Sequence, residues 1–374
     1  RSPPGGRRQR PGKASSAAAA WGPIQAGVTP RVAAALQRAW WQSQPNALAR
    51  ALRPLSSVYA ALAGLNKALT RPRRLDVPVL VVGNVIVGGA GKTPTVIALV
   101  RLLRLYGWTP GVVSRGYGRR GRGVVSVSAN SSAADCGDEP LLIHLRTDAP
   151  VLVDADRVAA ARALRLRHPT VDIIISDDGL QHHRLARDAQ VLVFDERGVG
   201  NGLLLPAGPL REQVPLEMPV TSLVLYNAAR PTLLLPGWTA LRRLSGVLSY
   251  DDWRSGLAPL ADSWRALQGR PIVAVAGIAS PERFFEPLRD LGLRITPIAL
   301  PDHDPLDTLP WPEGTPDVVL TEKDAVKLSS ARLGATRVWV APLDFEFDLG
   351  FAAAIKRLFP NPPGSTSWPP LTSD

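Results

Sequence analysis

The sequence is poor in cysteine and in long apolar runs, and each shortage excludes a class of protein. Its 374 residues contain one cysteine, Cys136. That count excludes an internal disulfide and a multi-cysteine metal site, and it fits a reducing compartment. No uncharged apolar run reaches the roughly 18 residues that a membrane-spanning helix needs, so a polytopic membrane protein is excluded as well.

Acidic residues are missing from the first 75 positions, which hold 13 Lys or Arg; the first carboxylate is Asp76. The remainder carries 31 basic and 32 acidic residues, a net charge of −1. A nucleic-acid groove would spread its cations over the folded domain, so we expect no nucleic-acid partner. The basic N-terminus instead predicts contact with an anionic surface. Lysine is also scarce, with 6 lysines against 38 arginines, and this singles out Lys92 and Lys323.

The length favours two domains, and changes in composition divide the chain further. We expect a disordered basic extension at 1–36, an amphipathic helix region at 37–75 and a disordered tail at 361–374. Between them, 76–215 and 216–360 are predicted to be a larger and a smaller α/β domain, the second with a linker. A wrongly assigned start or a signal peptide is the alternative for 1–36.

Apolar residues recur at steps of three and four from Leu48 to Leu69, as in an amphipathic helix. The positions are Leu48, Leu52, Leu55, Tyr59, Leu62, Leu65 and Leu69. Basic residues flank this stripe. The helix would therefore lie in a membrane interface or pack its stripe on the domain, and the spacing leaves both open.

Beyond Asp76, short runs of Val, Ile and Leu alternate with helical segments. Strands are predicted at 78–82, 111–114, 123–127, 150–153, 171–176 and 190–194, with helices at 92–106, 139–145 and 156–167. A second series has strands at 221–226, 271–276, 294–298, 317–320 and 337–340. Continuous apolar strands alternating with helices predict a mostly parallel sheet with both faces covered.

The glycine-rich segment Val-Val-Gly-Asn-Val-Ile-Val-Gly-Gly-Ala-Gly-Lys-Thr-Pro (81–94) follows a predicted strand and opens a predicted helix. Glycines let backbone N–H groups wrap phosphates, and a helix N-terminus adds positive potential. Lys92 would reach the β- and γ-phosphates, and the Thr93 hydroxyl would bind Mg²⁺. Ile86 stands where the usual phosphate-loop pattern has glycine.

Two carboxylates, Asp177 and Asp178, end another predicted strand and precede a glycine. Adjacent acids can simply cap a turn, but beside a phosphate loop they are the natural partners of a Mg²⁺ at Thr93. The letters Thr-Glu-Lys-Asp at 321–324 have the order wrong for a guanine-binding motif. ATP is therefore the predicted nucleotide.

Asp138 begins a predicted helix and is either an N-cap or a general base. Phosphoryl transfer to a hydroxyl needs a group that accepts the alcohol proton. His303, His182 and His183 are all available to orient or share that proton, and spacing does not choose among them.

Seven motifs in order resemble the tetraacyldisaccharide 4′-kinase family of lipid A biosynthesis over about residues 40–360. They are Gly-Gly-Ala-Gly-Lys-Thr-Pro (88–94), Ser-Arg-Gly-Tyr-Gly (114–118), Gly-Asp-Glu-Pro (137–140), Asp-Asp-Gly-Leu-Gln-His (177–182), Leu-Leu-Pro-Ala-Gly-Pro-Leu-Arg-Glu (204–212), Pro-Asp-His (301–303) and Thr-Glu-Lys-Asp-Ala-Val-Lys (321–327). The resemblance implies a P-loop NTPase-like domain with a second, smaller α/β domain. It also implies ATP-dependent phosphorylation of the 4′-hydroxyl of tetraacyldisaccharide 1-phosphate, giving lipid IVA.

The resemblance also implies site residues and a location. Asp138 and His303 would form the catalytic acid–base pair, and Gln181 and Glu212 would lie near the metal or nucleotide. Gln181 is also a candidate for substrate binding. The nucleotide loop would consist of Ile86, Val87, Gly88, Gly89, Ala90, Gly91, Lys92 and Thr93. The enzyme would sit as a monomer on the cytoplasmic face of the inner membrane through its N-terminal helix.

The lipid substrate needs an apolar surface for its chains and cations for its phosphate. Arg115, Arg119 and Arg120, in the glycine-rich loop after the second strand, are candidates for headgroup contacts or are solvated. Two other functions are the alternatives. One is a P-loop kinase or ATPase for a soluble metabolite, and the other is a nucleic-acid-binding protein whose binding depends steeply on salt.

Overall fold

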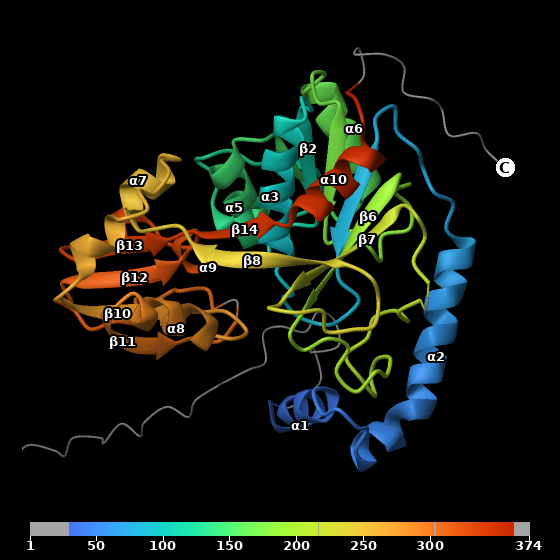
Figure 1. Ribbon diagram of the computed structural model, residues 1–374, viewed down its shortest axis with the longest axis horizontal. Coiled ribbons are helices and arrows are strands. Elements are labelled where there is room, and N and C mark those ends of the chain that lie inside the picture. The colour runs from blue at the N-terminus through green and yellow to red at the C-terminus, as the bar shows by residue number, and fades with distance from the viewer. Residues whose placement is uncertain (1–29, 216, 303, 363–374) are drawn as a thin grey trace, which may run out of the picture.

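The structure, a computed structural model, describes residues 30–215, 217–302 and 304–362. It has two α/β domains joined by a pair of long strands (Figure 1). This confirms the predicted class, a mostly parallel sheet with a second, smaller α/β domain. Most of the predicted tail and most of the predicted basic extension lie outside the described residues.

A nine-stranded sheet forms the larger domain, in the order β14-β8-β7-β6-β1-β5-β2-β4-β3. Its strands are β1 Val79–Gly83, β2 Pro110–Ser114, β3 Val125–Ser126, β4 Val151–Val153, β5 Ile173–Asp177, β6 Ala189–Asp195, β7 Ser222–Asn227, β8 Trp238–Leu244 and β14 Leu343–Phe347. All neighbours are parallel except β3 with β4 and β14 with β8. Every residue of β1, β2 and β5 is buried, as expected for parallel strands covered on both faces.

Helices surround this sheet. They are α3 Lys92–Leu105, α4 Ala133–Cys136, α5 Asp138–Thr147, α6 Arg157–Arg167 and α10 Leu349–Leu358. Helix α3 packs on β1, β2 and β5, while α5 and α6 pack on β4. The chain therefore places the N-termini of α3 and α5 at the same end of the domain as the carboxyl ends of the parallel strands.

The smaller domain has a five-stranded sheet in the order β11-β10-β12-β13-β9. Its strands are β9 Leu248–Ser249, β10 Pro271–Ala276, β11 Arg294–Ala299, β12 Asp317–Thr321 and β13 Arg337–Ala341. Its helices are α7 Tyr250–Arg254, α8 Glu282–Asp290 and α9 Glu322–Ala325, with short 3₁₀ turns at Ser263–Leu267 and Ser330–Arg332.

One predicted strand belongs to the other sheet. We expected the strand at 221–226 to open the second series, but β7 pairs with β6 and extends the larger sheet. The larger sheet also takes up β8 and β14, so the smaller sheet begins only at β9. The expected change of domain at 215/216 therefore precedes the change of sheet.

The N-terminal region contains two helices, α1 Pro30–Trp40 and α2 Ala47–Leu69. Because α1 begins at Pro30, residues 30–36 are helical, and the prediction that they are disordered is wrong. The last residue of α1, Trp40, attaches the helix to the larger domain by donating from Nε1 to the Pro206 carbonyl at 2.9 Å. Helix α2 is N-capped by Asn46, whose Oδ1 accepts from the Ala49 N–H at 2.9 Å. No helix in the described ranges combines the length and the apolar character needed to cross a bilayer.

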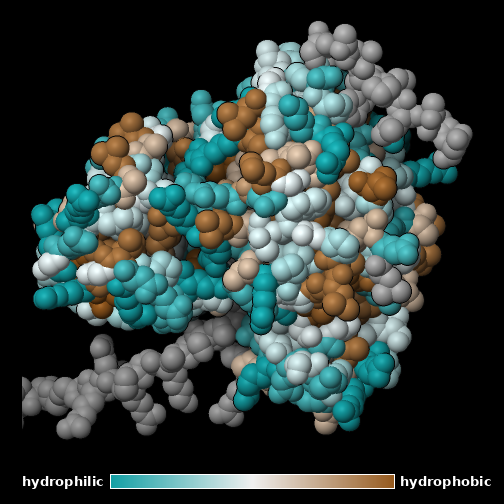
Figure 2. Space-filling view, in the orientation of Figure 1, coloured by the Kyte–Doolittle hydropathy of each residue, from teal (hydrophilic) through white to brown (hydrophobic). Residues whose placement is uncertain are grey.

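The two faces of α2 have different surroundings. On one face, Leu52 and Tyr59 pack beside Trp40, Ser56 Oγ donates to the Leu204 carbonyl at 2.8 Å, and the Tyr59 hydroxyl donates to the Arg211 carbonyl at 2.9 Å. The other face is exposed. Its apolar side chains, each at least 55% exposed, are Leu55, Val58, Leu62, Leu65 and Leu69. Figure 2 shows apolar side chains on the surface on the side of the molecule that carries α2.

Candidate active site

A glycine-rich loop joins β1 to α3, and two of its residues have backbone angles that favour glycine. Gly88 and Gly91 have φ of 96° and 89°, values that L side chains rarely adopt. A Cβ at Gly91 would lie 2.4 Å from Asn227 Nδ2. The loop therefore requires glycine at both places, which supports its prediction as a phosphate-binding loop.

Ile86 stands where the usual phosphate-loop pattern has glycine, and its surroundings account for the difference. Its side chain is fully buried, and its backbone forms an isolated bridge with Leu210. The neighbouring Val87 N–H donates to the Pro209 carbonyl at 2.9 Å. This half of the loop is thus anchored to segment 209–212, so it does not need the freedom of glycine.

Lys92 opens α3, and its Nζ donates to Asn84 Oδ1 at 3.2 Å. It also lies 3.5 Å from Asp178 Oδ1. Asn84 is fully buried, and its Nδ2 donates to the Gly88 carbonyl at 3.0 Å. Asn84 thus holds both the loop and the lysine. The sequence did not predict this role, although a polar residue among apolar neighbours was the available signal. Thr93 follows in the first turn of α3 and is buried.

Asp177 and Asp178 lie at the carboxyl end of β5, directly beside β1. Asp177 pairs in register with Val82 and accepts at Oδ2 from the Ser114 hydroxyl at 3.0 Å. Burial, followed by the neighbouring Asp178, raises the pKa of Asp177 to about 6. Burial also acts on Asp178, but Lys92 and Arg211 outweigh it and hold the pKa of that carboxyl below its usual value.

The two carboxylates suit a magnesium ion. Asp177 Oδ1 is buried without a hydrogen-bond partner, whereas Asp178 Oδ1 faces the cations Lys92 and Arg211. Mg²⁺ takes one or two carboxylates and completes its shell with water and phosphate oxygens, so this pair is a fitting donor set. Among the residues that the structure describes, no group of three or more His, Cys, Asp or Glu side chains could hold a metal by itself.

Gln181 links the phosphate loop to Glu212. Its Nε2 donates to the Asn84 carbonyl at 3.2 Å and to Glu212 Oε1 at 2.8 Å. Its Oε1 accepts from Arg211 at 3.3 Å, and Arg211 also lies 3.6 Å from Asp178. Gln181 and Glu212 therefore belong to the same site as the phosphate loop, at the side where the carboxylates lie.

Asp138 is the first residue of α5. Gly137 before it has a φ of 96°, and a Cβ there would lie 3.0 Å from Gly116 Cα, so the loop after β2 packs directly against the start of this helix. Asp138 Oδ2 lies 3.7 Å from Lys327 Nζ, which belongs to the smaller domain. The predicted partner His303 lies outside the described residues.

The other two candidate histidines have different surroundings. His182 Nε2 accepts from the Arg157 backbone N–H at 3.4 Å. Burial, reinforced by Arg157, lowers the pKa of His182 to about 4. Burial also lowers the pKa of His183. His182 is therefore neutral near pH 7 and lies at the start of α6.

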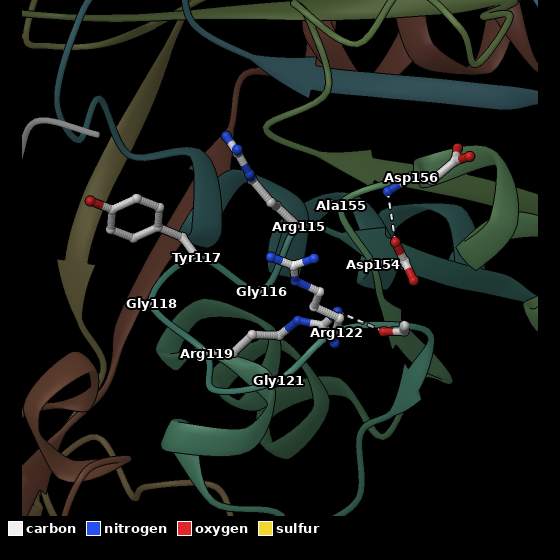
Figure 3. Close-up of a pocket in the computed structure, with 11 residues that line it drawn as sticks. Arg115, Gly116, Tyr117, Gly118, Arg119, Gly121, Arg122, Asp154, Ala155 and Asp156 are labelled. Carbon is white, nitrogen blue, oxygen red and sulfur yellow. Dashed lines mark hydrogen bonds between the residues drawn. The ribbon is translucent and has the colours of Figure 1, made fainter. Parts of the chain in front are cut away.

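The glycine-rich loop after β2 lines a cavity of about 610 Å³ (Figure 3). The cavity is lined by Arg115, Gly116, Tyr117, Gly118, Arg119, Gly121, Arg122, Gly123, Asp154, Ala155 and Asp156. Arg119 donates to the Val153 carbonyl at 3.2 Å and to the Gly123 carbonyl at 2.6 Å, which orders the loop. Arg115 is exposed, whereas Arg120 does not line the cavity. The structure thus places Arg115 and Arg119 on the cavity and leaves Arg120 outside its lining.

Comparisons with known proteins agree on one family. A protein-family model described as tetraacyldisaccharide-1-P 4′-kinase matches residues 48–360. The tetraacyldisaccharide 4′-kinase of Methylibium petroleiphilum is 54% identical over 332 residues, which are 86% of this chain and 92% of that protein. Its counterpart from Leptothrix cholodnii is 50% identical over 343 residues, covering 89% of this chain and 98% of that one.

A solved structure is similar as well. The crystal structure of LpxK from Aquifex aeolicus in complex with ATP has a TM-score of 0.68 and 26% identity, and the match covers 83% of this chain and 99% of that one.

Proposed function

The chain belongs to the tetraacyldisaccharide-1-P 4′-kinase family, and we propose that it uses the site described above to move the γ-phosphate of ATP onto the 4′-hydroxyl of a tetraacyldisaccharide 1-phosphate. This step yields lipid IVA in lipid A biosynthesis. One observation carries the proposal: Lys92 at the start of α3 and the acids at the end of β5 converge, with Lys92 Nζ 3.5 Å from Asp178 Oδ1.

The phosphate loop would bind the nucleotide through residues 86–93. Lys92, which now faces Asp178, would then reach the β- and γ-phosphates. Thr93, Asp177 and Asp178 would hold Mg²⁺, with Glu212 placed near it through Gln181. When bound, the ion neutralises charge on the phosphates and orients them.

Asp138 would accept the proton of the 4′-hydroxyl as its oxygen attacks the γ-phosphorus and the bond to ADP breaks. The placement of Asp138 at a helix start, beside the loop after β2, supports this role. His303 would share that proton, a role that rests on the family resemblance. Arg115 and Arg119 on the cavity in Figure 3 would face the phosphate of the substrate headgroup.

The enzyme would act at the cytoplasmic face of the inner membrane, as a monomer. The exposed apolar face of α2 supports the membrane location, because its five large side chains are covered by no protein surface in the described part of the chain. Arg50, Arg53 and Lys67 on the same helix would meet lipid phosphates, each worth about 1 kcal/mol near an anionic leaflet. The acyl chains of the substrate would then enter from the bilayer.

The test is transfer of labelled γ-phosphate from ATP to tetraacyldisaccharide 1-phosphate in mixed micelles. Lys92→Ala and Asp138→Ala are each expected to lose at least about 100-fold in rate. Lys356→Ala is the control, because that exposed lysine of α10 contacts only the Tyr106 ring among the described interactions. ATP hydrolysis without labelling of the lipid would refute the substrate and favour a soluble acceptor. Full activity of Asp138→Ala would refute its role as base.

A further inference from the structure

A short helix of the smaller domain, α9, lies against α5 of the larger domain (Figure 1). At the far end of α5, Arg146 donates to both carboxylate oxygens of Glu322, at 2.7 and 2.6 Å. These two side chains are 9% and 6% exposed. The helix that starts at Asp138 is therefore fixed to the smaller domain through its last turn.

Glu322 belongs to the motif Thr-Glu-Lys-Asp-Ala-Val-Lys (321–327), and two lysines of this motif lie against the first turn of α5. Lys323 Nζ lies 2.9 Å from Glu139 Oε1 and 3.9 Å from Asp302 Oδ1. Lys327 Nζ lies 3.7 Å from Asp138 Oδ2. The smaller domain thus places one ammonium group on each of the two acids that open α5, and Lys323 also reaches the residue before His303.

The Lys327 ammonium is held from behind by Asp324. Asp324 is fully buried; its Oδ2 accepts from the Gly277 N–H at 2.8 Å and from the Thr321 hydroxyl at 2.6 Å. Its Oδ1 lies 3.4 Å from Lys327 Nζ. Since the Lys327 side chain is only 5% exposed, its ammonium group is directed at the two carboxylates and away from solvent.

We propose that Lys327 is a positioning residue for the kinase reaction: it fixes the Asp138 carboxylate at the place where that group takes the proton from the substrate hydroxyl. Lys323 fixes the neighbouring carboxylates of Glu139 and Asp302 in the same manner. The inference rests on the proposed role of Asp138. It gives a function to the Thr-Glu-Lys-Asp-Ala-Val-Lys motif, which the nucleotide site leaves unused. Two of the six lysines of an arginine-rich chain occur there. The ammonium group of Lys327 is a compact charge that lies near both the Asp138 and the Asp324 carboxylate.

The experiment compares Lys327→Met, Lys327→Arg and the control Lys356→Met in full-length protein. We expect Lys327→Met to lower kcat at least about 10-fold while KM for ATP stays within about 2-fold, because the lysine acts through Asp138 and does not touch the nucleotide loop. Lys327→Arg keeps the charge and should recover part of kcat. Lys356→Met should match the wild type.

A second variant separates positioning from folding, because Lys327→Met leaves the Asp324 charge buried and unpaired. Lys327→Met/Asp324→Asn removes both charges; we expect its thermal midpoint to return toward the wild-type value while kcat stays low. If this folded double variant has wild-type kcat, or if every loss of rate follows the folded fraction, the inference is overturned. Asp138→Ala in the same assay distinguishes the two proposals. If it is inactive while Lys327→Met is fully active, only the inference fails, and if it is itself fully active, the proposed function of Asp138 fails.

Discussion

Replacing Arg146 by Met is expected to lower the free energy of unfolding by about 3 kcal/mol. Removing one partner of a buried ion pair typically costs about 3–5 kcal/mol, because the other charge stays buried without compensation. Glu322 would keep two neutral donors, Trp253 Nε1 and the Leu343 N–H, each at 3.0 Å. These bonds place the expected cost at the lower end of that range.

The measurement is urea unfolding with linear extrapolation. Arg243→Ala provides the control, since its pair with Glu346 is 3.4 Å long and 62% and 53% exposed; it should cost no more than about 0.5 kcal/mol. Arg146→Met/Glu322→Gln should recover part of the loss, because Glu322 then carries no charge and Asp344, the other acid that Arg146 contacts, keeps its ion pair with Arg101 at 2.8 Å. A loss below about 1 kcal/mol for Arg146→Met would refute the argument that this buried pair joins α5 to the smaller domain.

Three further predictions test other parts of the molecule. Gly91→Ala should destabilise the protein by about 1–3 kcal/mol, since a Cβ would meet Asn227 at a φ of 89°, whereas Gly64→Ala, with nothing within 4 Å, should stabilise helix α2; thermal unfolding compares the two. Leu62→Glu should weaken binding to anionic vesicles at least about 10-fold without changing the thermal midpoint, because that side chain is 63% exposed; unchanged sedimentation with vesicles would contradict the membrane role of α2. Burial lowers the pKa of His182 to about 4, so the unfolded chain binds more protons than the folded protein between pH 6.5 and pH 4, and stability falls as pH decreases through that window. His182→Gln should flatten this dependence, which urea midpoints measured at pH 7 and pH 4.5 would show. An unchanged dependence on pH would contradict the prediction.

Much of the fold was predictable because buried parallel strands appear in the sequence as uninterrupted apolar runs. The strand expected at 271–276 coincides with β10, and the helix expected at 92–106 ends one residue beyond α3. The pairing of β7 was not predictable in this way. Its apolar run indicates a strand, but only three-dimensional packing determines that its neighbour is β6.

In the candidate site, too, local patterns could be predicted from the sequence and contacts between distant residues could not. The glycine-rich loop and the two acids at the end of β5 could be singled out from the sequence, because glycines followed by Lys92, and adjacent acids such as Asp178 after a strand, form local patterns. The contact of Arg146 with Glu322 was not, because 176 positions separate the two residues and each is an ordinary charged residue in its own segment. Local motifs thus predicted that Lys92 and Asp178 lie together, as they do at 3.5 Å, while the contacts between the domains required the structure.

The chain leaves the larger sheet through β8 and returns through β14, which pair antiparallel with Leu244 opposite Leu343. The two ends of the intervening segment touch, since the Ser245 N–H donates to the Pro342 carbonyl at 3.0 Å. In topological terms the smaller domain is an insertion into a hairpin, and a short turn between Leu244 and Leu343 would close the larger fold without it. Such a shortened protein would keep every residue of the phosphate loop and lose both lysines that face Asp138 and Glu139. The larger domain could therefore be separated from the smaller one as a fold, but it would lack the lysines that position the proposed base.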